Sequence, residues 1–209
     1  MYIEFLGIPG CGKTYHAGIY KLQLIKEGKK IIDLSRQKTM PFWLKLFYKL
    51  AELCLLKLPK YRRMTQEYAE ACKECTDKPS FLPFSLQYCI KDIVLASLLH
   101  DIFRNKNIIF INDEGQLQRM VFLILQYEVS YDKVMSIYNK YRDSNIRTIY
   151  IRNDVETSIK NIRLRNRHVC PMDELKEDKL TMYLNSFYSI CEMLKKDCQN
   201  NFSIKNVSI

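Results

Sequence analysis

A short glycine-rich segment constrains this chain more than any other feature does. Residues 7–14 read GIPGCGKT and match the pattern G-x-x-x-x-G-K-[ST] without a mismatch. The segment follows residues 2–6, which read as a buried strand, and precedes a helix expected over residues 15–27. Glycines let successive backbone N–H groups face phosphate oxygens, and the start of a helix adds its dipole. The segment therefore predicts a site for the phosphates of ATP or a similar nucleotide.

The residues of this loop have distinct expected roles. Lys13 can neutralise charge on the β- and γ-phosphates, and the Thr14 hydroxyl can bind Mg²⁺. The residues expected to contact the nucleotide are Gly7, Gly10, Cys11, Gly12, Lys13, Thr14 and Tyr15. The alternative is a chance match on a tight turn, which the flanking strand and helix disfavour.

Strand-like and helix-like segments alternate along the chain, as they do around a parallel sheet. The expected further strands are 30–34, 107–111, 146–151 and, at an edge, 202–209. The expected further helices are one that runs to about Asp143, one that begins near Val155, and one over 178–198. Prolines divide residues 37–105 into helical blocks without a clear strand. We expect one domain over 1–209: a three-layer α/β fold of the P-loop NTPase type, with helices around a parallel sheet of about five strands and a helical insert at 37–105.

Two carboxylates, Asp113 and Glu114, directly follow the apolar segment 108–112. In an open parallel sheet the ligand lies at the carboxyl ends of the strands, where nucleotide-binding proteins with such a loop hold the Mg²⁺ shell with an acidic residue. We expect Asp113 to bind Mg²⁺ directly or through water, and Glu114 to orient a water or contact the substrate. A solvated turn with helix-capping acids is the alternative.

Three arginines, Arg163, Arg165 and Arg167, lie between the fourth expected strand and the last expected helix. Guanidinium groups can stabilise the negative charge that phosphoryl transfer spreads over the migrating group. Residues 163–177 therefore read as a lid that could close over the nucleotide and exclude water. A solvated basic face is the alternative.

The segment from Ile151 to Arg167 resembles the strand, helix and lid of thymidylate kinases and deoxynucleoside kinases. The residues that match this pattern are Glu156, Ile159, Ile162, Arg163, Arg165 and Arg167. The order and spacing of the phosphate loop, Asp113 and this segment also resemble that group of P-loop kinases. The resemblance implies a five-stranded parallel sheet with helices on both sides and transfer of the ATP γ-phosphate to a small acceptor.

The sequence departs from this family's pattern at several positions. Arg152 stands where an acidic residue is usual, and Asn161 replaces an arginine that is usual early in the lid helix. Glu114 and Gly115 stand where an arginine usually follows the acidic strand end, and Arg119, one helical turn later, could substitute for it.

The resemblance places the acceptor beyond the second strand. Asp33 could be a general base for a sugar hydroxyl, or simply a turn or cap residue. Arg36, Glu114 and Arg119 are the other candidate substrate contacts.

The chain is basic, with 33 Lys and Arg against 23 Asp and Glu and a formal net charge of +10. Such a surface suits anionic small substrates, nucleic acid or anionic lipid. Residues 42–63 are basic, aromatic and apolar, and could contact a membrane surface peripherally. Packing into the domain's own core, or lining the acceptor site, is the more usual role of such a segment.

The scattered cysteines indicate reduced thiols and a cytoplasmic protein rather than a disulfide framework. Cys72 and Cys75 form a lone C-x-x-C, which reads as one side of a helix rather than a metal site. The sequence contains no run of about 20 apolar residues, so we expect no membrane-spanning helix. The N-terminus does not read as a signal peptide.

We predict a kinase that uses ATP and Mg²⁺ and phosphorylates a small acceptor such as a nucleoside or a nucleoside monophosphate. The first alternative is a nucleic-acid-stimulated NTPase, because the GxPGCGKT loop with a later Asp-Glu pair also resembles viral helicases. A chain of 209 residues leaves little room for a second motor domain. The second alternative is a regulatory ATP-binding module. ATP or GTP as the donor, and any oligomeric state, are left open.

Overall fold

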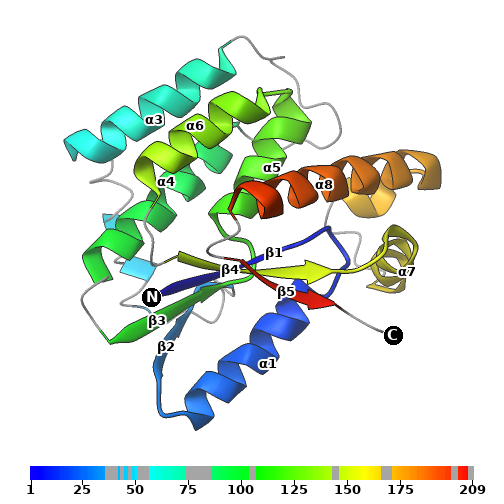
Figure 1. Ribbon diagram of the computed structural model, residues 1–209, viewed down its shortest axis with the longest axis horizontal. Coiled ribbons are helices and arrows are strands. Elements are labelled where there is room, and N and C mark those ends of the chain that lie inside the picture. Colours follow the sequence, from blue (N-terminus) through cyan, green and yellow to red (C-terminus); the bar gives the residue numbers. More distant parts are fainter. Residues whose placement is uncertain are drawn as a thin grey trace.

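Five parallel strands form the central sheet of the computed structural model (Figure 1). The strands are β1 (Tyr2–Leu6), β2 (Lys30–Asp33), β3 (Ile108–Asn112), β4 (Ile146–Arg152) and β5 (Phe202–Asn206). Their order across the sheet is β2-β3-β1-β4-β5, and every neighbouring pair is parallel. Because β1 lies at the centre, the loop that follows it begins in the middle of the carboxyl edge of the sheet.

The structure describes most, but not all, of the chain. The described residues are 1–35, 42, 45, 46, 49, 50, 57–73, 86–103, 107–142, 146–165, 171–198 and 202–206. The described helices are α1 (Lys13–Lys26), α3 (Pro59–Cys72), α4 (Leu86–Phe103), α5 (Gln116–Tyr127), α6 (Tyr131–Tyr141), α7 (Val155–Arg165) and α8 (Glu177–Asp197), with a short 3-10 helix, η2 (Pro171–Glu174).

Helices cover the two sides of the sheet unequally. Helix α1 lies on one side, whereas α4, α5 and α8 lie on the other, with α3 and α6 side by side farthest from the sheet (Figure 1). All five residues of β1 are buried, as expected for a central strand whose two faces are both covered. The architecture is the predicted α/β fold with a parallel sheet between helices, and β5 is the predicted edge strand.

The sequence prediction was wrong about one helix, and several element boundaries differ from it by one or two residues. The helix expected to run to Asp143 is two helices, because Glu128 adopts a left-handed conformation with φ of 54° and ends α5. Helix α1 begins at Lys13, inside the glycine-rich motif, and β2 ends at Asp33. Apolar spacing continues across the break at Glu128, so periodicity alone did not reveal it.

The sequence favoured packing of the apolar segment 42–63 into the core. The first positions of this segment that the structure describes are exposed instead. Phe42, Leu46 and Leu50 are helical, and their exposed fractions are 82%, 49% and 51%. Lys45 and Lys49 are exposed as well. The burial of hydrophobic side chains resumes at α3, where Tyr61 and Met64 belong to the core. Within the described part of the chain, no helix is both long and apolar enough to cross a bilayer.

Glu4 is a fully buried carboxyl group in the central strand. Its Oε1 accepts a hydrogen bond of 2.9 Å from the Thr148 hydroxyl of β4. A Cβ added to Gly115 would lie only 2.1 Å from Oε2, so Glu4 also packs directly against the start of α5. Burial raises the pKa of Glu4 to about 7, although Thr148 and the backbone N–H groups of Gln116 and Leu117 act to lower it. Glu4 therefore ties β1 to β4 and to the segment that carries Asp113.

We expect Glu4→Gln to reduce the pH dependence of the free energy of unfolding. Because the pKa of folded Glu4 lies above its ordinary value of 4.5, its stabilisation is complete below pH 4.5 and is lost as the pH rises through 7. A shift of this size corresponds to roughly 3 kcal/mol. Glutamine cannot ionise, so the variant should lack this loss.

Urea unfolding of both proteins at about pH 5 and about pH 8 measures the effect. Glu27→Gln, which removes an exposed carboxyl group after α1, is the matched control. Equal pH dependence in the wild type and in Glu4→Gln would contradict this account of Glu4.

Candidate nucleotide-binding site

The phosphate loop, residues 7–14, connects β1 to α1 and turns tightly. Gly10 and Gly12 have φ of 84° and 91°, a left-handed conformation that glycine adopts without steric cost. A Cβ on Gly10 would lie 2.4 Å from the carbonyl oxygen of Ser158 in α7, so no larger residue fits there. The loop therefore has the compact backbone that the sequence motif predicts.

Neighbouring elements hold the loop from two sides. A Cβ on Gly7 would lie 2.6 Å from the carbonyl oxygen of Ile151 at the end of β4. The Asn161 side-chain amide of α7 donates a 2.9 Å hydrogen bond to the carbonyl oxygen of Gly10. From α5, the Gln118 side-chain oxygen accepts a 3.4 Å hydrogen bond from the backbone N–H of Gly7. These contacts fix the loop relative to the sheet.

Lys13 places a buried positive charge inside the loop. Its Nζ donates hydrogen bonds of 2.8 Å and 3.1 Å to the carbonyl oxygens of Gly7 and Ile8. The side chain therefore follows the loop and does not extend into solvent. An ammonium group held here is well placed to neutralise phosphate charge.

Thr14 and Asp113 meet at the carboxyl edge of the sheet although they lie 99 positions apart in the sequence. The Thr14 hydroxyl donates a 2.6 Å hydrogen bond to Oδ2 of Asp113. Burial raises the pKa of Asp113, as does the neighbouring charge of Glu114, while the Thr14 hydroxyl lowers it. A cation at this carboxylate would offset the cost of keeping it ionised in a buried position.

The Thr14 and Asp113 oxygens fit a magnesium ion. Mg²⁺ prefers oxygen ligands and is commonly bound through one or two protein groups, with water and substrate phosphates completing its shell. Across the described residues, no group of three or more His, Cys, Asp and Glu side chains could enclose a metal ion. A magnesium ion here would therefore rely on nucleotide phosphates for part of its coordination.

Ser35 joins the segment after β2 to this site, which the sequence did not indicate. Its hydroxyl oxygen accepts a 3.1 Å hydrogen bond from the backbone N–H of Asp113. Its own backbone N–H donates to Asp33, which also forms a 2.8 Å ion pair with Lys21 of α1. Burial would raise the pKa of Asp33, but the hydrogen bonds from Lys21 and Ser35 lower it overall. Asp33 is thus held in a turn next to the site, and the candidate contact Arg36 lies outside the described residues.

Arg119 reaches the acidic strand end, as expected from its position one helical turn later in the sequence. Its Nη2 lies 3.3 Å from Glu114, and its Nε lies 3.1 Å from Asp92 of α4. Burial raises the pKa of Asp92, while the charge of Arg119 lowers it. Asp92 could not be identified from the sequence, because only the packing of α4 against α5 brings it to Arg119.

The described arginines of the lid-like segment do not contact the phosphate loop in this structure. Arg163 donates hydrogen bonds of 2.6 Å to the carbonyl oxygens of Asp173 and Leu175, and so ties α7 to the segment before α8. Arg165 is exposed at the end of α7, and Arg167 lies outside the described residues. Arg152 points instead to α8, where it donates to the Tyr188 hydroxyl at 2.8 Å.

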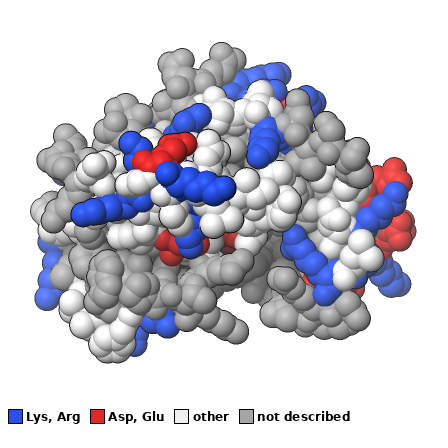
Figure 2. Space-filling model, turned by 90° about the horizontal axis from the view of Figure 1, so that it is seen from below, with Lys and Arg blue, Asp and Glu red and all other residues white. Residues whose placement is uncertain are grey.

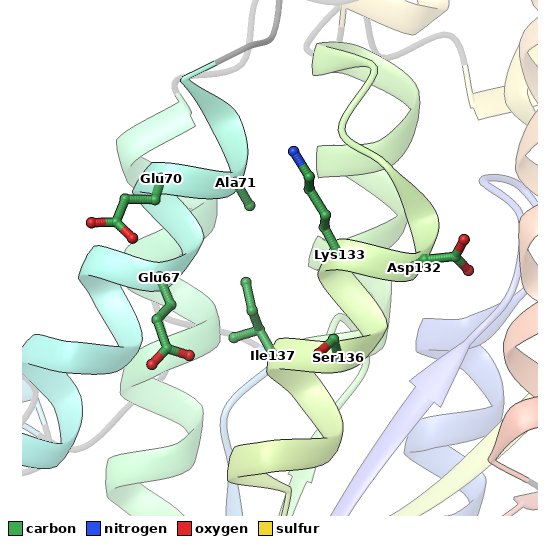
Figure 3. Close-up of a pocket in the computed structure, with 7 residues that line it drawn as sticks. All are labelled: Glu67, Glu70, Ala71, Asp132, Lys133, Ser136 and Ile137. Atoms are coloured by element: carbon green, nitrogen blue, oxygen red, sulfur yellow. The ribbon is translucent and has the colours of Figure 1, made fainter.

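A separate groove lies between α3 and α6 (Figure 3). It has a volume of about 510 Å³, and Glu67, Glu70 and Ile137 are among its lining residues. Ile137 points toward α3, whereas Asp132 points away from it (Figure 3). None of the predicted site residues lines this groove, so we do not assign it to the nucleotide site.

The fold and the phosphate loop together define a P-loop α/β architecture of the deoxynucleoside kinase type. No protein-family model matches the chain, and no curated protein matches it. Two solved structures of deoxyadenosine kinase from M. mycoides are similar over the whole of this chain. The structure with bound dATP has a TM-score of 0.51, 16% identity and 91% of its own chain covered. The structure with the products dCMP and a flexible dCDP has a TM-score of 0.53, 16% identity and 90% covered. At this identity the likeness establishes the fold.

We expect Asn161→Ala to weaken ATP binding, because Gly10 loses the amide that orients its carbonyl group. One hydrogen bond contributes about 1 kcal/mol, which corresponds to a rise of roughly five-fold in the Kd for ATP with Mg²⁺. Isothermal titration calorimetry measures this change. Lys160→Ala, which removes an exposed neighbour on α7, is the control. Unchanged affinity in Asn161→Ala, or an equal loss in the control, would show that this contact does not shape the loop.

Proposed function

We propose that the protein is an ATP-dependent phosphotransferase that uses Mg²⁺ and transfers the γ-phosphate to a small acceptor. The hydrogen bond between Thr14 and Asp113 carries this proposal, because it joins the hydroxyl and the carboxylate that would bind the metal. Lys13 lies within the same loop. The kinase-type fold, which extends over the whole chain, supports the same conclusion.

We assign the catalytic roles from this geometry. Lys13 neutralises charge on the β- and γ-phosphates, and Thr14 and Asp113 would hold Mg²⁺, which would supply positive charge beside the phosphates. Gly7, Gly10, Gly12, and the backbone of Cys11 and Tyr15, form the rest of the phosphate cradle.

The lid arginines act at the outer side of the nucleotide in this proposal. Arg165 and Arg167 contact the migrating phosphoryl group when residues 163–177 close. Arg163 holds the carbonyl groups of Asp173 and Leu175, so its part is to keep the segment before α8 attached to α7. Closure would bring the positive charge of Arg165 and Arg167 to the phosphates while the hydrogen bonds of Arg163 stay intact.

The acceptor binds on the side of β2 and α4. Asp33 is the candidate general base, and its ion pair with Lys21 and the hydrogen bond from Ser35 hold it as a carboxylate next to the site. Glu114 and Arg119, with Arg36, are the candidate acceptor contacts, and Asp92 orients Arg119. A nucleoside or nucleoside monophosphate offers the hydroxyl or phosphate oxygen that such groups bind. The similar kinase structures hold dATP, dCMP and dCDP, which favours this class of acceptor.

A reducing compartment such as the cytoplasm suits this chemistry and this chain. Each described cysteine is a free thiol and is buried: Cys11, Cys72, Cys89, Cys191 and Cys198.

We expect phosphoryl transfer from labelled ATP with Mg²⁺ to at least one member of a panel of nucleosides, nucleoside monophosphates and sugars. Lys13→Ala should lower the rate by about 100-fold or more, because it removes a charge that stabilises the transition state. Lys26→Ala, which removes an exposed lysine at the other end of the same helix, should retain the wild-type rate.

Two outcomes would contradict the proposal. ATP hydrolysis that rises with single-stranded RNA or DNA, without transfer to any acceptor, would identify a nucleic-acid-stimulated NTPase. Tight ATP binding with no transfer and no hydrolysis would identify a regulatory module.

A further inference from the structure

Helix α1 carries apolar side chains on two opposite sides. Ala17 and Leu24 are buried toward the sheet. The residues on the outer side are Tyr15, Ile19, Leu22 and Ile25, with exposed fractions of 69%, 40%, 61% and 49%. Their spacing of four, three and three residues places them along one side of the helix. We call these four residues the outer stripe. A surface helix normally carries polar residues on the side that faces away from its core.

The outer stripe belongs to α1, which the sheet separates from most of the other helices that the structure describes. Helices α3, α4, α5, α6 and α8 all lie on the other side (Figure 1). The nucleotide site uses the first turn of α1, through Lys13 and Thr14. Ile19, Leu22 and Ile25 follow later in the helix, so the proposed chemistry gives them no role.

Basic side chains surround the end of the outer stripe that is farther from the phosphate loop. Lys26, Lys29 and Lys30 are exposed there, with Glu27 as the acidic residue among them. Arg147 of β4 extends to Tyr20 of α1, 3.4 Å from its hydroxyl group. Figure 2 views the molecule from the side on which α1 lies in Figure 1, and blue basic surface is more widespread there than red acidic surface.

Charge distinguishes the possible partners of such a surface. Two copies of this chain, each with a formal net charge of +10, would repel each other and would bring their lysine clusters close together. An anionic lipid surface has the complementary charge, and each Lys or Arg near it contributes about 1 kcal/mol. Lysine stems can also lie along apolar surface while their ammonium groups reach lipid phosphates.

We propose that the outer stripe of α1 docks onto the surface of an anionic lipid bilayer. Ile19, Leu22 and Ile25 insert at the boundary between head groups and acyl chains, while Lys26, Lys29 and Lys30 contact lipid phosphates. Tyr15 continues the stripe toward the phosphate loop, and tyrosine is common at this depth. This surface is distinct from residues 42–63, and the proposal does not depend on the kinase activity.

Co-sedimentation of the full-length protein with lipid vesicles tests the proposal. Vesicles that contain phosphatidylglycerol should bind the wild type, vesicles of phosphatidylcholine alone should bind it weakly, and salt should weaken binding. Leu22→Glu with Ile25→Glu should reduce binding by about ten-fold or more, because two inserted side chains become charged. Ile102→Glu with Met182→Glu is the matched control, since it changes the net charge equally at exposed apolar positions on α4 and α8.

Four outcomes would overturn the proposal. The first is a wild type that does not bind phosphatidylglycerol vesicles. The second is an equal loss of vesicle binding in the control variant. The third is a loss of vesicle binding in Phe42→Glu with Leu46→Glu but not in the α1 variant. The fourth is a dimer in sedimentation velocity that the α1 variant dissociates, which would assign the stripe to a second copy of the chain. Circular dichroism verifies folding. If the double variant unfolds, Lys29→Ser with Lys30→Ser must instead lower the affinity for phosphatidylglycerol vesicles.

Discussion

The close approach of the phosphate loop to the end of β4 and to α7 positions the rest of the site. Gly7 and Gly10 lie so near the carbonyl oxygens of Ile151 and Ser158 that a Cβ at either glycine would clash with backbone. Helix α7, whose last residues Arg163 and Arg165 begin the segment predicted as a lid, therefore packs directly against the loop. The hydrogen bond from Asn161 to Gly10 adds a polar contact to this steric one.

Buried polar groups make a second set of connections beneath the loop. Glu4 contacts Thr148 of β4 and Gly115, and Gly115 lies two residues after Asp113. Gln116 donates to the carbonyl oxygen of Ile93 at 3.0 Å and to the Ser97 hydroxyl at 2.6 Å, which ties the start of α5 to α4. Because unsatisfied polar groups are costly in the interior, these contacts favour one arrangement of the strand end that carries Asp113. Asp113, the loop of residues 7–14 and the start of α5 are in this way held together at one edge of the sheet.

The features that sequence could predict are those that depend on local chemistry. The glycine spacing of residues 7–14 and the apolar strands gave the fold, and the acids after 108–112 gave the partner of Thr14. Ser35, Gln118 and Asp92 could not be found in this way, because only the packing of distant elements brings them to the site. The left-handed Glu128 was missed for a different reason: an apolar pattern that continues across a turn hides the turn. The spacing of Ile19, Leu22 and Ile25 is visible in the sequence, but only the fold shows that they face outward. The roles of the predicted site residues stay predictions, those of Lys13, Thr14 and Asp113 as much as those of Arg163, Arg165, Arg167 and Asp33.

The most direct test of this account is calorimetric titration of ATP in the presence and absence of Mg²⁺, in the wild type and in Asp113→Asn. Asparagine keeps the shape of Asp113 but loses the charge that holds the metal. The account predicts that Mg²⁺ strengthens ATP binding to the wild type by about ten-fold or more, and that Asp113→Asn loses most of this gain. A wild type that does not bind ATP, or binds it equally well without Mg²⁺, would contradict the assignment of Thr14 and Asp113 as the metal site.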